Sequence, residues 1–217
     1  MLKENINMSV EVVSSDDNKN TYEIRRKWKE EKKKALVIEL YPTISSIECY
    51  KSDLSTMHLI NHSEELGWGE VRIVNLYSRI FESKPSTSEL KDDVVNLSYV
   101  EEILEQENIN TYDIVIAWGN SLSTHKTTIK MKIDLLNMLK DKGLQQQVKC
   151  IITENLSVVE GYGVHPLYLG LRYAKDKWSL VEYPVEKELE KLEEVLKPKV
   201  KPKKKTAKKV AEKSKSV

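Results

Sequence analysis

The sequence predicts a single α/β domain of three layers, with a mainly parallel sheet of about four strands. Three observations predict it. Four short apolar runs are rich in β-branched residues, the segments between them have helical spacing, and Gly, Pro or Asn punctuate the boundaries. Continuous apolar strands that alternate with amphipathic helices are typical of a parallel sheet covered on both faces. With 217 residues, 40% of them hydrophobic, one domain with one core is the simplest organisation.

The first half of the domain is expected to contain two strands and one helix. Residues 35–40 (ALVIEL) form the first strand, and Pro42 prevents a helix from starting directly after it. Residues 53–66 have mostly helical spacing of their apolar side chains, and Gly67 ends that helix. Residues 71–76 (VRIVNL) form the second strand.

The second half repeats this alternation. We expect helices at residues 94–106, 126–140 and 186–196, the second with a clear apolar face. The third strand covers residues 113–118 (DIVIAW), and the fourth covers residues 148–153 (VKCIIT). The chain is therefore expected to form right-handed crossovers between parallel strands.

The two ends differ from the domain, which is expected to span residues 35–196. Residues 1–34 are predicted to be a polar leader with a short charged helix, YEIRRKWKEEKKK, at residues 22–34. Residues 197–217 hold ten lysines, one glutamate and no aromatic residue, so a disordered tail is expected. The tail carries a net charge of +9, which leaves −8 for the other 196 residues.

The lysine-rich tail predicts a possible partner. Such a run attracts phosphate backbones without reading the bases, so we expect non-specific contact with nucleic acid. A merely solvated extension is the alternative. The lysines that would make these contacts are Lys203, Lys204, Lys205, Lys208 and Lys209.

Several function classes are disfavoured by missing motifs. The chain has no phosphate-binding P-loop, no G-x-G-x-x-G and no G-x-S-x-G, and only seven glycines. Its two cysteines form no C-x-x-C pair, and His58 and His62 lack the glutamate of a zinc-binding H-E-x-x-H. We therefore expect no metal and no cofactor, and two surface histidines. Without a secretory signal or an 18-residue apolar run, a cytoplasmic protein with no membrane contact is expected.

Candidate binding residues follow the ends of the predicted strands. In a parallel α/β sheet the ligand site lies beyond the carboxyl ends of the strands, where separate segments converge. Aromatic rings and amides there suit a nucleobase or nucleotide, although ordinary turn chemistry is the alternative. His165 is the catalytic candidate, because a histidine can donate to an anion or shuttle a proton. The expected ligand-binding residues are Tyr41, Pro42, Thr43, Asp53, Asn75, Arg79, Trp118, Gly119, Asn120, His165 and Pro166.

An ordered series of short motifs resembles a bacterial and phage family known as domain of unknown function 1643. The series spans residues 35–170. It consists of Leu40-Tyr41-Pro42-Thr43, Asp53-Leu54-Ser55-Thr56, Gly67-Trp68-Gly69, Ile73-Val74-Asn75-Leu76, Ala117-Trp118-Gly119 and His165-Pro166-Leu167-Tyr168-Leu169. Two positions depart from the family pattern. Tyr41 stands where an asparagine is usual, and Ser46 stands near a position that is often acidic.

The motif order is also similar to that of the uracil-DNA glycosylase superfamily, and this similarity implies a glycosylase-like fold. It further implies a pocket for a base or nucleotide that His165 faces. No residue from Tyr41 to Ser46 matches the activating aspartate of the first glycosylase motif, although Asp53 follows nearby.

Three functions therefore stay open. The chain could be an enzyme of glycosylase type acting on nucleic acid or nucleotides, a non-catalytic nucleotide-binding protein of a phage or mobile element, or a protein-interaction module. A water-activating carboxylate near His165 would favour the enzyme. The sequence does not indicate an oligomeric state.

Overall fold

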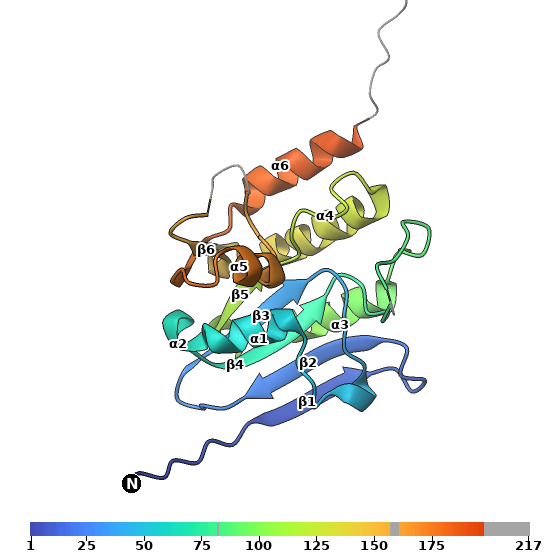
Figure 1. The fold of residues 1–217 in the computed structure, drawn as a ribbon. Helices are drawn as coiled ribbons and strands as arrows, with labels where there is room; N and C mark the ends of the chain where they lie inside the picture. Colours follow the sequence, from blue (N-terminus) through green and yellow to red (C-terminus); the bar gives the residue numbers. More distant parts are fainter. Residues whose placement is uncertain (82, 157–160, 198–217) are drawn as a thin grey trace, which may run out of the picture.

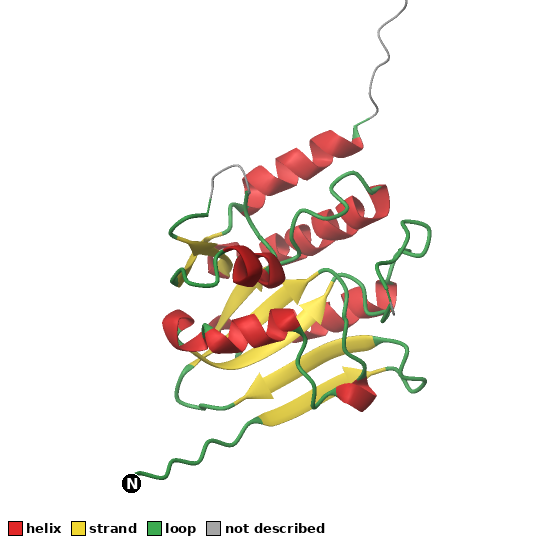
Figure 2. Ribbon diagram, viewed as in Figure 1, coloured by secondary structure: helices red, strands yellow, loops and turns green. Residues whose placement is uncertain are grey.

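The computed structural model describes residues 1–81, 83–156 and 161–197, which form one twisted sheet with helices on both faces (Figures 1 and 2). The strands are β1 (Ser9–Ser14), β2 (Thr21–Lys27), β3 (Lys33–Glu39), β4 (Trp68–Asn75), β5 (Tyr112–Ile116), β6 (Val148–Thr153) and β7 (Trp178–Glu182). The α-helices are α1 (Leu54–Asn61), α2 (Ser63–Leu66), α3 (Val94–Leu104), α4 (Lys126–Asp141), α5 (Pro166–Arg172) and α6 (Val185–Leu196).

The prediction of a mainly parallel sheet of about four strands was wrong. Within the described residues the sheet has seven strands in the order β1-β2-β4-β3-β5-β6-β7, and it is mixed. The pairs β4–β3, β3–β5 and β5–β6 are parallel, whereas β1–β2, β2–β4 and β6–β7 are antiparallel. The four apolar runs therefore correspond to the inner strands. The remaining strands β1, β2 and β7 contain more polar residues and lack the continuous apolar run of a buried strand.

The largest local error concerns residues 22–34, where a charged helix was expected and strand β2 occurs instead. Charged residues enter the sheet there because they meet opposite charges on β4. Arg25 Nε donates to Glu70 Oε1 at 2.9 Å, and Arg72 Nε donates to Glu23 Oε1 at 2.6 Å. Glu23, Glu70 and Arg72 are all buried. Buried charges are tolerated when they are paired in this way, so charge alone did not exclude a strand.

The core consists of two apolar layers, one on each face of the sheet. One layer joins Leu36 and Ile38 of β3 to buried side chains of α3, α4 and α6. The other joins Ala35 and Val37 of β3 to side chains of α1, α2 and α5. Since successive strand residues point to opposite faces, the position of a residue along a strand decides which helices it meets.

Two sequence expectations concern the chain beyond these layers. The lysine-rich tail is expected at residues 197–217; Lys197 is the C-cap of α6, and residues 198–217, with the five named lysines, lie outside the described residues. Among the residues that are described, no helix is long and apolar enough to cross a membrane.

Candidate functional site

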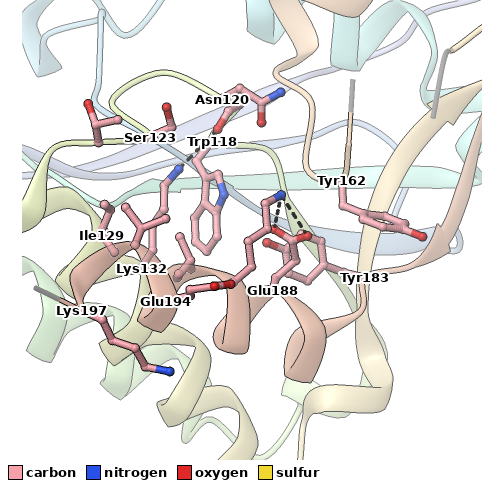
Figure 3. A pocket seen from close by; sticks show the side chains of 15 residues that line it. Trp118, Asn120, Ser123, Ile129, Lys132, Tyr162, Tyr183, Glu188, Glu194 and Lys197 are labelled. Atoms are coloured by element: carbon pink, nitrogen blue, oxygen red, sulfur yellow. Dashed lines mark hydrogen bonds and ion pairs between the residues drawn. The ribbon is translucent and has the colours of Figure 1, made fainter. Parts of the chain in front are cut away.

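Seven of the eleven expected site residues line one or the other of two pockets at the carboxyl end of the parallel strands. The first, which we call the β3-end pocket, has a volume of 210 Å³. Its main lining residues are Glu39, Tyr41, Thr43, Asp53, Ser55 and His165. The second, which we call the α4–α6 pocket, has a volume of 730 Å³ (Figure 3). Its main lining residues are Trp118, Ile129, Lys132, Tyr162, Tyr183 and Glu188.

The expectation that all these residues share one cleft was therefore wrong. Strand alternation explains the division. Glu39 points to the same face as Ala35 and Val37, toward α1 and α5, whereas Trp118 belongs to the layer beneath α4 and α6. Tyr41 and His165 line the β3-end pocket, whereas Trp118 lies in the layer beneath α4 and α6, against which the Tyr41 ring also packs.

Gly119 separates the two pockets and connects the loops around them. Its N–H donates to the Gly163 carbonyl at 2.8 Å, and its own carbonyl accepts from Lys132 Nζ at 3.3 Å. A Cβ at Gly119 would lie 3.1 Å from the His165 Cβ, and the backbone φ is +66°. Both the close approach and the left-handed backbone therefore require glycine at this position.

Four expected site residues lie outside both linings. Asn75 is buried and pairs with Glu39 in the β3–β4 register, but it lines neither pocket. Arg79 forms an isolated bridge with Asn20 and lies over the Phe81 ring at 5.4 Å. Pro42 and Pro166 are buried beside lining residues. The remaining expected residue, Asn120, lines the α4–α6 pocket with Gly119.

Glu39 is the main feature of the β3-end pocket, and the sequence argument missed it. Only 5% of the residue is exposed, and its Oε1 has no hydrogen-bond partner within the described part of the chain. Burial, and secondarily the charge of Asp53, raises the pKa of the Glu39 carboxyl to about 8. The group is therefore largely protonated at neutral pH, and it can donate one hydrogen bond and accept another.

Asp53 supplies a second carboxyl group, but its oxygens are already bound. It is the N-cap of α1, where Oδ1 accepts the Thr56 N–H at 2.8 Å. Its Oδ2 accepts a hydrogen bond from the Thr43 hydroxyl. These contacts fix the orientation of the carboxylate and leave it less free to activate a water molecule.

His165, which also lines the β3-end pocket, is held in a defined tautomer. It is the N-cap of α5, and its Nδ1 accepts the Leu167 N–H at 3.2 Å. The ring proton consequently resides on Nε2. Burial lowers the pKa of His165, while the Asp53 charge opposes that shift, so the ring is neutral at pH 7. A neutral imidazole can donate to a ligand carbonyl but does not pair with a phosphate as a cation.

The α4–α6 pocket has a different chemistry. Lys132 projects from α4 beneath the loop after β5, and its Nζ lies 5.0 Å from the centre of the Trp118 ring (Figure 3). Tyr183 contacts the rings of both Trp118 and Tyr162 edge-on, with centroids 6.3 Å apart in each pair. Aromatic and aliphatic side chains thus surround a single buried cation.

His58 of α1 and His62, which caps that helix, both pack near the Trp178 ring. His62 stacks on the Trp178 ring at 4.1 Å, and the His58 ring lies 6.5 Å from that tryptophan. Both histidines are half-buried, so the expectation of surface residues was wrong. Within the described ranges no group of three or more His, Cys, Asp or Glu side chains could hold a metal ion. His125 is the N-cap of α4, where its side chain accepts the Thr128 N–H.

Comparison with known proteins identifies the family. The family model described as "Protein of unknown function (DUF1643)" matches residues 21–167, more than half of the chain. No curated protein and no solved structure matches the chain. The matched range includes both the Tyr41 motif and His165, which line the same pocket. The chain therefore belongs to the DUF1643 family of proteins of unknown function.

Proposed function

We propose that the protein binds a nucleobase, free or as part of a nucleotide, in the β3-end pocket. The observation that carries this proposal is the buried Glu39 carboxyl group, whose Oε1 has no partner within the described structure. An unpaired buried polar atom is costly, and a ligand that supplies the missing hydrogen bond removes that cost.

The chemistry of the lining supports a base over other small ligands. A protonated carboxyl presents a donor beside an acceptor, which matches the adjacent acceptor and donor on the edge of a nucleobase. The Nε2–H of His165 adds a second donor, and Tyr41 adds an aromatic ring. The volume of 210 Å³ is below the roughly 300–1,000 Å³ of drug-sized sites, and therefore suits a single small ring system.

We propose recognition without cleavage as the simpler activity. Both oxygens of Asp53 accept hydrogen bonds from the protein, and Glu39 carries its proton at neutral pH. Neither carboxyl is therefore well suited to activate water. The glycosylase-like reading predicts instead that free base is released from nucleosides or DNA. Chromatography of those substrates after incubation with the protein tests it, and release of base above the buffer control would overturn the non-catalytic proposal.

The base-binding proposal is tested by calorimetric titration of the five common bases and their nucleosides into the full chain. We expect at least one to bind. Glu39→Leu should weaken the binding of that ligand by at least about tenfold, because two hydrogen bonds are lost. Glu39→Gln keeps one donor and one acceptor, so it should retain binding within a few fold.

The pH dependence makes this test specific. The affinity of the natural protein for the base should fall above pH 8, because Glu39 then ionises and can no longer donate a hydrogen bond. The Glu39→Gln protein should lack that fall. His165→Asn, which retains a side chain able to cap α5, should weaken binding by roughly 2- to 12-fold. The proposal fails if no base binds at millimolar concentration, or if Glu39→Leu binds as well as the natural protein.

The lysine-rich tail leads to a separate prediction about nucleic acid. Deleting residues 198–217 removes nine lysines, and should weaken binding to DNA or RNA and flatten its salt dependence. Fluorescence anisotropy with a labelled oligonucleotide, between low and physiological salt, measures both effects. Affinity for a free base should be unchanged, because the lysines attract phosphate backbones and do not read the bases. Equal affinity and equal salt slope with and without the tail would contradict this prediction.

A further inference from the structure

The α4–α6 pocket contains a buried cation that is not paired with a carboxylate. Lys132 lies on the apolar face of α4 between Ile129 and Ile133, and only 5% of it is exposed. Its hydrogen-bond acceptor is the Gly119 carbonyl, at 3.3 Å. Within the described ranges no carboxylate oxygen lies within 4.0 Å of its Nζ.

The acidic side chain of α6 that acts on this charge is itself paired with another lysine. Glu188 of α6 lines the same pocket, but both its oxygens accept hydrogen bonds from Lys191 at 3.4 Å (Figure 3). An ammonium group has three donors, and Lys132 uses one of them on a neutral carbonyl. Burying a cation without a carboxylate partner is costly. The neighbouring positions on this face of α4 are apolar, so packing of the helix does not require a charge there. Burial lowers the pKa of Lys132 to about 8, which reflects the same cost.

The pocket around Lys132 has the size and lining of a small-molecule site. Its 730 Å³ lies within the range of about 300–1,000 Å³ that is usual for ligands larger than a single ring. Ile129, Leu192 and the rings of Trp118 and Tyr183 provide apolar walls. Tyr162 stands at the rim with 39% of its surface exposed, where it can cover a planar group.

The balance of charge around the pocket indicates what the ligand carries. Of the described residues, three lysines (Lys132, Lys191 and Lys197) and two glutamates (Glu188 and Glu194) line it, which leaves one positive charge in excess among them. One anionic group restores neutrality, whereas a polyphosphate would be repelled by the two glutamates.

We propose that the α4–α6 pocket binds a planar aromatic molecule that bears a single carboxylate, with the carboxylate on Lys132 and the ring against the aromatic wall. This site lies on the opposite face of the sheet from the β3-end pocket, and it does not rest on base binding there. It requires only that the apolar pocket admit the ring and that Lys132 receive the negative charge.

The test uses two ligands of equal shape and different charge. 2-Naphthoate and its uncharged analogue 2-naphthamide are titrated into the full chain by calorimetry, up to millimolar concentration at pH 7. We expect naphthoate to bind at least tenfold more tightly. Lys132→Met should reduce that ratio to about one while naphthamide still binds. Lys130→Met is the matched control, since Lys130 lies on the same helix but is exposed and near Asp92, outside the pocket.

Two further readouts separate charge recognition from shape. Naphthoate binding at pH 8 should take up protons, because the ligand favours the charged form of Lys132; titrations in buffers of different ionisation enthalpy measure this uptake. Tyr162→Ala should weaken both ligands by the same factor. The proposal is overturned if neither ligand binds, if both bind the natural protein equally, or if the naphthoate preference survives Lys132→Met.

Discussion

Replacing Glu39 with glutamine is expected to stabilise the protein by a margin that grows with pH. The pKa of Glu39 is raised from 4.5 to about 8 in the folded chain. Below pH 4.5 the carboxyl is protonated in both states, so its titration contributes nothing to the difference in stability. Between pH 4.5 and 8 the unfolded chain loses this proton while the folded chain keeps it, so stability falls as pH rises.

Glutamine has nearly the same shape as glutamate but does not titrate. The increase in the free energy of unfolding from Glu39→Gln should therefore level off near pH 8. One pKa unit corresponds to 1.36 kcal/mol, which gives an upper bound of about 5 kcal/mol for the free energy of unfolding. Urea unfolding at pH 5, 6.5 and 8 measures the difference between variant and natural protein. Glu107→Gln, at an exposed position, controls for the loss of one surface carboxylate. A difference that stays constant over this range would show that Glu39 is ionised in the folded state.

The inner sheet could be predicted because its signal is local. Strands β3, β4, β5 and β6 coincide with four apolar runs, and the intervening helices follow from the spacing of residues such as Ile129 and Leu136. Strand β2 could not be found in this way. Its charges are stable inside the sheet only because Glu70 and Arg72, more than forty residues away, supply partners. That pairing is a property of the tertiary structure and leaves no periodic pattern in β2 itself.

The division of the site into two pockets depended on strand alternation. The register pairs Ile38 with Ile116, so Glu39 and Trp118 must point to opposite faces. A sequence argument based only on strand ends brought them together, since it ignored which face each residue occupies. Considering the parity of positions along each strand would have separated Glu39 from the tryptophan.

Two important residues carried a signal that was not used. Glu39 is the one charged residue of the run ALVIEL, and Lys132 interrupts the apolar face of α4. In both cases an ionisable side chain occupies a position whose neighbours are buried. Such residues are seldom fully buried without a partner, and they mark candidate sites when they border a cavity.

The second large effect is expected at Lys132, where methionine should stabilise the protein at neutral pH. Burial lowers the pKa of the ammonium group from 10.5 to about 8. The cost of the buried charge is therefore fully present below pH 8, and it disappears as pH rises toward 10.5, because the folded chain then sheds the proton first. Glu188 and Lys191 face this group from α6, and their opposite charges largely cancel.

Methionine retains an unbranched apolar side chain and removes the charge, so Lys132→Met should raise the free energy of unfolding by roughly 2–3 kcal/mol at pH 7. The gain should shrink when the two proteins are compared at pH 10. Urea unfolding at both values measures it, with Lys130→Met as the exposed control on the same helix. A destabilised Lys132→Met protein would mean that the charge already has a compensating partner within the fold. That result would also remove the reason for an anion to bind there. If Lys132→Met is instead more stable without ligand, and naphthoate stabilises the natural protein enough to remove that difference, the cost of burying Lys132 is linked to its role in binding.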